Sequence, residues 1–121
     1  MINDLPLFQL YGAMARHAAE TQRVSAANIS RADEPGYKAQ QVESFADYMG
    51  RMAAAGPDGA DPLTGEFRVR EADLPAAPNG NSVSLETEIF KSADAAGQHN
   101  MALTVYNKSL DLMRTAIGKP R

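Results

Sequence analysis

The sequence predicts a mainly α-helical protein in which two long helices, one near each end of the chain, form a coiled-coil-like hairpin. At both ends of the 121-residue chain, apolar residues recur at spacings of three and four, as on one face of a helix. Between them lies an irregular segment rich in proline and glycine, which can hold a short β element. We therefore divide the chain into an N-terminal helix (1–31), a turn and loop segment (32–82) and a C-terminal helix (83–121), the two helices together making one helical domain.

The N-terminal helix is predicted from two apolar stripes that lie side by side. Asp4 can cap its start, and Pro6 suits its first turn. Arg16, Glu20 and Arg23 fall on the opposite face, which we expect to be solvated. The first stripe contains Leu7, Leu10, Met14, His17, Thr21, Val24 and Asn28, and the second contains Phe8, Tyr11, Ala15, Ala18, Gln22, Ser25 and Ile29.

This helix is expected to end at a tight turn. Glu34 precedes Pro35, which pushes it out of the helical region, and Pro35-Gly36 suits the central positions of a type II turn. We take Asn28, Pro35, Gly36 and Tyr37 as the residues of a turn motif. Tyr37 is expected to anchor the turn or a neighbour, because an aromatic directly after a forced turn has a fixed exit direction. For Asn28, a role in the motif and a plain position near the helix end both stay open.

The middle of the chain has little periodicity. Five of the seven prolines and six of the nine glycines fall between Ala32 and Ser82. Only Glu66 to Leu74 is predicted to form a short strand, because Phe67, Val69 and Glu71 alternate, though weakly, with charged residues.

A second long helix is predicted from about Ser84 to Ile117. Ser82 or Ser84 can cap its start, and Gly118 can end it. Its first stripe contains Ile89, Ser92, Ala96, His99, Leu103, Tyr106, Leu110, Met113 and Ile117, and its second contains Ala102, Val105, Ser109, Leu112 and Ala116.

The apolar arc of this second helix is too wide for one partner helix to cover. Lys108, Asp111 and Arg114 leave only a narrow polar strip opposite the two stripes. We therefore expect other subunits to cover the remainder. The candidate interface residues are Leu7, Leu10, Tyr11, Met14, Val24, Asn28, Ile29, Leu103, Tyr106, Leu110, Met113 and Ile117.

The composition argues against several classes of function. The net charge is −3, and no Lys/Arg cluster occurs, which argues against nucleic-acid binding. The chain has no cysteine, no Ser-His-acid set and no Gly-rich phosphate loop, so we expect neither an enzyme nor a cofactor. No apolar run approaches eighteen residues, and the first residues do not resemble a cleaved signal peptide.

Metal binding is weakly indicated at most. His17, Glu20 and His99 could be ligands, but both histidines lie within apolar stripes and no convincing further ligands accompany them. We expect polar residues of a helix seam and no metal. A calcium loop is not predicted either, because Ala60 and Pro62 stand where oxygen ligands are needed.

Two stretches resemble the bacterial flagellar rod and hook family. In that family an N-terminal helix ends in a pattern close to A-N-x-A-N-x-x-T-P-G-Y-K/R. Here the match falls on Ala27, Asn28, Ile29, Ala32, Asp33, Pro35, Gly36, Tyr37 and Lys38, whereas Ser30, Arg31 and Glu34 depart from it. Near the other end, Gly80 to Glu88 and Met113 to Ile117 resemble the start and end of the C-terminal helix of the proximal rod subunit in this family.

The resemblance implies a structural subunit of the proximal rod of the flagellar basal body. Such a subunit is exported through the type III apparatus without a cleaved signal peptide and polymerises helically in the periplasm. It forms part of a hollow drive shaft that transmits torque and passes exported subunits.

Its implied partners are further copies of itself, other rod proteins, the rod-to-ring adaptor protein and the export apparatus, with no direct membrane insertion. In this interpretation the turn directs residues 37–82 outward, toward neighbouring subunits. Another rod-family subunit and a secreted helical-hairpin adaptor or binding module remain as alternatives.

Overall fold

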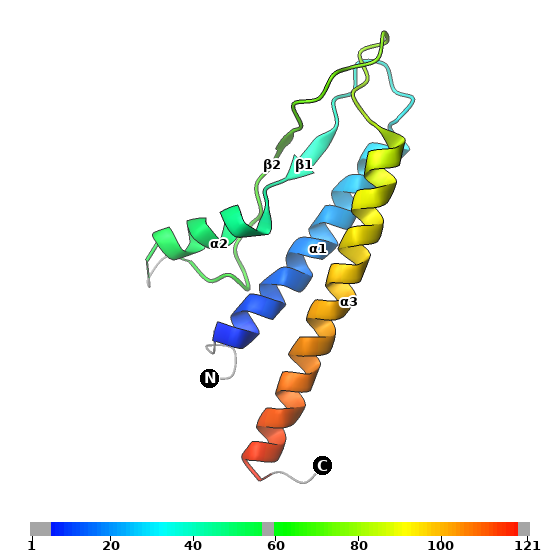
Figure 1. Ribbon diagram of the computed structural model, residues 1–121. Coiled ribbons are helices and arrows are strands. Elements are labelled where there is room, and N and C mark those ends of the chain that lie inside the picture. The colour runs from blue at the N-terminus through cyan, green and yellow to red at the C-terminus, as the bar shows by residue number, and fades with distance from the viewer. Residues whose placement is uncertain (1–5, 57–59, 119–121) are drawn as a thin grey trace.

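The computed structural model describes residues 6–56 and 60–118. Two long helices run antiparallel and side by side, and a two-stranded sheet lies in the middle of the chain (Figure 1), which confirms the predicted fold class. The cap expected at Asp4 lies outside the described residues. The elements are α1 (Pro6–Ser30), β1 (Gln40–Val42), α2 (Phe45–Ala54), β2 (Val69–Glu71) and α3 (Leu85–Ala116).

The buried residues of the hairpin are mostly small. Ala15 and Ala18 of α1 are buried, as are Ala95 and Ala102 of α3. Ala95 and Ala102 are seven residues apart and therefore lie on the same side of α3. Small side chains let two helices approach closely, but each contributes little buried apolar area.

The large apolar side chains lie mainly outside. No leucine or isoleucine is among the buried residues in the described part of the chain, whereas Phe90 is 73% exposed and Leu112 is 71% exposed. The rings of Phe8 and Tyr106 meet edge to face, with their centroids 5.3 Å apart, near the start of α1. Residues 107–116 of α3 therefore continue for about 15 Å past this contact, and Figure 1 shows the helix extending beyond α1.

The middle segment is more regular than the sequence indicated. Strands β1 and β2 pair antiparallel, with Gln41 opposite Arg70. The strand predicted within residues 66–74 is confirmed as β2, but β1 and α2 were not predicted. Helix α2 begins after Ser44, whose side chain accepts a hydrogen bond from the backbone N–H of Asp47 at 3.1 Å. Ser-x-x-Asp is a helix-start signal that the richness in proline and glycine concealed.

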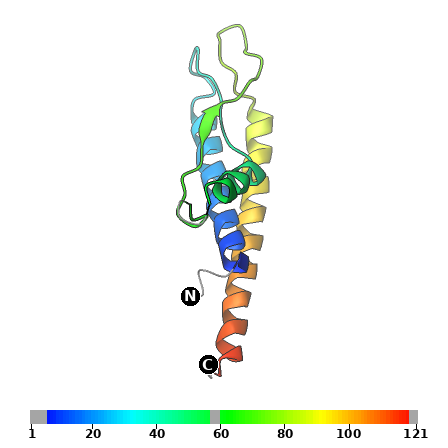
Figure 2. The same cartoon turned by 90° about the vertical axis from the view of Figure 1, so that its left-hand side faces the viewer.

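Part of the middle segment also packs against the helices. Strand β1 runs along α1, whereas α2 projects away from the hairpin and is seen nearly end-on in Figure 2. The expectation that the turn directs residues 37–82 away from the helices is therefore wrong for β1. The prediction of a solvated Arg16 is also wrong, because its side chain is half-buried against the loop that follows α2.

The alanine packing makes a test of the hairpin. Replacing Ala102, which is 0% exposed, by leucine forces α1 and α3 apart. We expect a loss of about 1–3 kcal/mol in the free energy of unfolding, measured by urea denaturation followed by circular dichroism. Ala93→Leu places the same side chain at an exposed position of α3 and should change stability little. Equal effects of the two substitutions would contradict close packing at Ala102.

Candidate functional site

The turn after α1 has the predicted geometry. The backbone N–H of Tyr37 donates to the carbonyl oxygen of Glu34 at 3.2 Å, and Gly36 has a φ of +77°. These are the features of a type II turn with Pro35 and Gly36 at its centre, so this prediction is confirmed.

Asn28 connects the last turn of α1 to the start of β1. It is completely buried, and its amide group donates to the carbonyl oxygen of Gln40 at 2.8 Å. Its side-chain oxygen accepts from the backbone N–H of Gln40 at 3.0 Å and from the Tyr37 hydroxyl at 2.8 Å. The Asn28 amide thus pairs with Gln40 as a neighbouring strand would. Arg31 lies over the Tyr37 ring, with its guanidinium carbon 5.5 Å from the centroid.

The segment before α3 binds the same turn. The side-chain amide of Asn81 is buried and donates to the carbonyl oxygens of Arg31 at 2.9 Å and Glu34 at 2.8 Å. The backbone N–H of Gly36 donates to the carbonyl oxygen of Asn79 at 2.9 Å. The end of α1 and the chain leading into α3 are therefore joined directly.

Ser82 and Gly80 complete this contact. The Ser82 hydroxyl accepts from the backbone N–H of Ala39 at 2.8 Å, and Ser84 is the residue that caps α3. Gly80 has a φ of +87°, and a Cβ there would lie 3.2 Å from Gly36 Cα. The sequence pattern did not identify Asn81, Ser82 and Gly80 as partners of the turn. The resemblance at Gly80 to Glu88 was the signal that could have drawn attention to them.

A second network holds the loop after α2 against α1. The Arg16 guanidinium donates to the carbonyl oxygens of Pro62 at 2.9 Å and Gly65 at 2.7 Å, and it lies 4.8 Å from the Phe67 ring centroid. The hydroxyl of Tyr48, which is completely buried, donates to the same Pro62 oxygen at 2.6 Å. Arg16 is thus a structural residue of the protomer.

Glu43 is the charged centre of the middle segment. Its buried carboxylate accepts from the Arg51 guanidinium at 2.5 Å and from the backbone N–H of Arg68 at 2.9 Å. The hydrogen bond from Arg51 holds the pKa of Glu43 below its usual value, although burial acts in the opposite direction. The backbone carbonyl of Glu43 accepts from His17 Nε2 at 2.7 Å.

Neither histidine lies in a cluster of metal ligands. His17 lies between the rings of Phe45 and Phe67, and His99 lines a groove between α1 and α3. Within residues 6–56 and 60–118, no three His, Cys, Asp or Glu side chains are grouped so that they could hold a metal ion. Over the same residues, no helix is long and apolar enough to cross a membrane.

The predicted interface residues differ widely in exposure. Val24 and Asn28 are buried within the protomer. Tyr11, Met14, Ile29, Tyr106, Leu110 and Met113 are half-buried. The exposed members of the set are Leu7, Leu10, Leu103 and Ile117.

Three further apolar side chains form a row along α3. Phe90, Met101 and Leu112 are all exposed and follow one another at intervals of eleven residues. Eleven residues make about three helical turns, so the three side chains lie on one face over about 33 Å. Of these three residues, only Leu112 belongs to one of the two stripes predicted for this helix.

Comparison with known proteins supports the resemblance. The chain is 28% identical over 117 residues to the flagellar basal body rod protein FlgB of Escherichia coli (strain K12), with 82% of this chain and 83% of that protein covered. The chain is therefore similar to a flagellar basal body rod protein over most of its length. FlgB of Shigella flexneri matches with the same identity and coverage. No protein-family model matches the chain.

The similarity to FlgB confirms the resemblance to a proximal rod protein. It supports a structural role in the flagellar basal body rod, which fits a protein that is not an enzyme. The aligned region covers most of both chains, so the similarity is not confined to the turn motif.

The contacts of Asn28 give a test of the turn. Asn28→Ala leaves the backbone N–H and carbonyl of Gln40 without these partners, and we expect the free energy of unfolding to fall by about 2 kcal/mol. The measurement is urea denaturation followed by circular dichroism. Asn100→Ala, at an exposed position of α3, is the control and should have little effect. A loss no larger than that of the control would contradict the bridging role of Asn28.

The ion pair of Glu43 gives a pH dependence. Because the pKa of Glu43 is lowered from 4.5 by folding, its contribution is present above pH 4.5 and is lost as the pH falls through the folded pKa. Glu43→Gln should therefore be clearly less stable than the native protein at pH 6, and the difference should narrow at pH 3. Glu20→Gln is the control. Its partner Arg23 is largely exposed, so loss of this ion pair should change the stability little at either pH. A difference between Glu43→Gln and the native protein that stays constant from pH 6 to pH 3 would rule out this role.

Proposed function

We propose that this protein is a subunit of the proximal rod of the bacterial flagellum, and that its copies polymerise helically into part of a hollow drive shaft. The shaft transmits torque and passes exported subunits. The protein reaches the periplasm through the flagellar export apparatus and contacts other rod proteins and the rod-to-ring adaptor protein.

The observation that carries this proposal is the apolar surface of the protomer. Large apolar side chains lie outside on both ends of α3, whereas alanine fills much of the hairpin interior. Large apolar side chains gathered on one exposed surface are typical of a protein contact. A contact between unlike surfaces of identical subunits generates a helical filament when it does not close into a ring.

The part of α3 beyond α1 is the strongest candidate for such a contact. The ring contact of Phe8 with Tyr106 marks the point after which α3 continues past α1. Leu112 in this extension is 71% exposed, and Ile117, which caps its end, is 64% exposed. Burying two such side chains against another subunit would contribute about 3 kcal/mol or more to association.

Ile117→Asp tests the proposal, because it changes an exposed side chain and should leave the protomer folded. In the native host, we expect the variant to be exported and to be depleted at least tenfold from purified basal bodies, with loss of swimming. Asn107→Asp adds the same charge at an exposed polar position of the same extension and should incorporate normally.

Two outcomes would contradict this assignment. Absence of the native chain from purified basal bodies would exclude a rod subunit and would favour the secreted adaptor. Normal incorporation of Ile117→Asp into basal bodies, with normal swimming, would show that the extension is not part of the subunit interface.

A further inference from the structure

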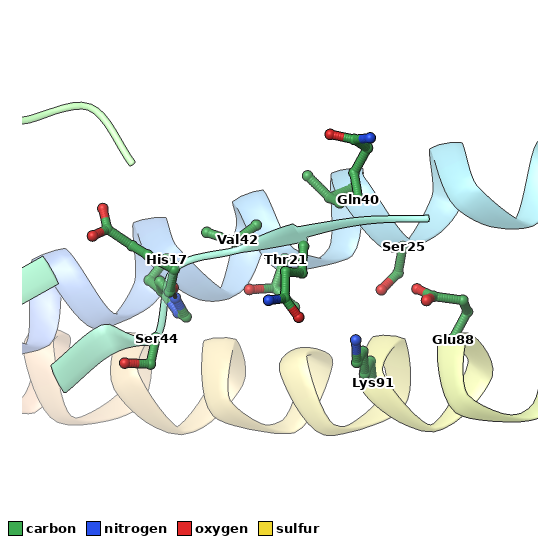
Figure 3. A pocket seen from close by; sticks show the side chains of 11 residues that line it. His17, Thr21, Ser25, Gln40, Val42, Ser44, Glu88 and Lys91 are labelled. Carbon is green, nitrogen blue, oxygen red and sulfur yellow. Dashed lines mark hydrogen bonds between the residues drawn. The ribbon is translucent and has the colours of Figure 1, made fainter. Parts of the chain in front are cut away.

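A pocket of about 230 Å³ lies between α1, β1 and the first turns of α3. Thr21, Val24 and Ser25 of α1 form one wall, and Val42 of β1 lies above them (Figure 3). Glu88 and Lys91 of α3 form the opposite wall. The pocket is therefore partly apolar and carries a carboxylate at one end.

The carboxylate of Glu88 is buried without a partner. The residue is 1% exposed, and neither of its carboxylate oxygens has a hydrogen-bond partner among the described residues. Figure 3 shows the group directed from α3 toward Ser25, into the space between the helices. A buried carboxylate is costly unless a hydrogen-bond donor or an opposite charge compensates it, so a cationic or strongly donating group beside Glu88 would be stabilised.

Two other sources of positive charge fit less well. A metal ion needs several ligands, and no group of three His, Cys, Asp or Glu side chains in the described residues could supply them. Lys91 lies one turn further along α3 and lines the pocket, but its amino group makes no ion pair with Glu88. Lys91 is also half-exposed, so water can solvate its amino group.

We propose that the Glu88 pocket receives an arginine or lysine side chain from a second copy of this chain. Such a side chain has an apolar stem, which suits the walls at Val24 and Val42, and a cationic head, which suits the carboxylate of Glu88. The inference rests on the proposed helical assembly. In that assembly every copy with a pocket also offers the same exposed basic residues, among them Arg70 and Lys108, so one contact repeats along the filament.

The test uses Glu88→Gln, which keeps the shape of the side chain and removes its charge. We expect self-association of the purified protein, measured by analytical ultracentrifugation, to weaken about tenfold while the urea midpoint does not fall. Glu86→Gln changes an exposed carboxylate in the same turn of α3 and should associate like the native protein. Glu88→Gln that associates as strongly as the native protein would overturn the proposal.

A photo-crosslinking residue at Gln41, on the pocket rim, identifies the occupant in a mixture of ¹⁴N- and ¹⁵N-labelled protein. Mixed-isotope cross-links to a peptide with an arginine or lysine support a second copy. Cross-links within single copies only, or to a different rod protein in purified basal bodies, contradict it.

A double-mutant cycle of Glu88→Gln and Lys91→Met tests the alternative that Lys91 of the same copy compensates the Glu88 carboxylate. Coupling between Glu88 and Lys91 in urea unfolding, with association unchanged by Glu88→Gln, would assign the carboxylate to Lys91 and overturn the proposal. If basal bodies contain the native chain and Glu88→Gln incorporates equally well, only this inference fails. If they lack the native chain, the proposed function itself fails.

Discussion

The contact between α1 and α3 is made largely by small side chains, and this constraint determines where the apolar surface of the protein lies. Alanines at positions such as 18 and 102 pack closely, and outside the Phe8–Tyr106 contact large apolar side chains such as Phe90 and Leu112 lie on the outer faces. The middle segment covers part of the outer face of α1 with aromatic rings and with the hydrogen bonds of Arg16. It leaves large apolar side chains exposed near both ends of α3, among them Phe90 and Leu112. A protomer of this kind keeps much of its hydrophobic free energy available for association.

The two ends of the helical hairpin are fixed by different interactions. At one end, Asn28, Tyr37 and Asn81 join the turn after α1 to the chain before α3 through hydrogen bonds. At the other end, the rings of Phe8 and Tyr106 pack edge to face. Hydrogen bonds are directional and specify the register of the helices at the turn. The ring contact supplies burial where α1 begins.

The sequence was sufficient for the helices and for the turn, because these depend on local signals. The stripes predicted α1 and α3, and Pro35-Gly36 predicted a type II turn, which Gly36 adopts with a φ of +77°. Long-range contacts were harder to predict from the sequence. Arg16 occupies the polar face of an isolated helix, and only the fold brings Pro62 and Gly65 to it. Helix α2 was missed although Ser44 and Asp47 gave a local signal, since the surrounding prolines and glycines dominated the interpretation.

In the candidate site, too, some features could be predicted from the sequence and others needed the structure. The similarity in the turn motif was visible in the sequence, but the role of Asn28 as a partner of the Gln40 backbone needed coordinates. The stripes contained Ile117 and four of the exposed leucines, Leu7, Leu10, Leu103 and Leu112, but not Leu74 or Leu85. The burial of Glu88 did not, because a glutamate in the first turn of a helix is ordinarily solvated and favoured there by the helix dipole.

The extension of α3 beyond α1 has a mechanical consequence. A helix held along one part of its length acts as a lever, and a small tilt at the alanine contact grows into a larger displacement at the free arm. From Tyr106 to Ala116 the arm is about 15 Å long, so a tilt of about 5° would move its tip by about 1 Å. If a neighbouring subunit contacts Leu112 and Ile117, its position would therefore depend on the angle at which α1 and α3 cross. The geometry of one protomer would then be coupled to the position of the next.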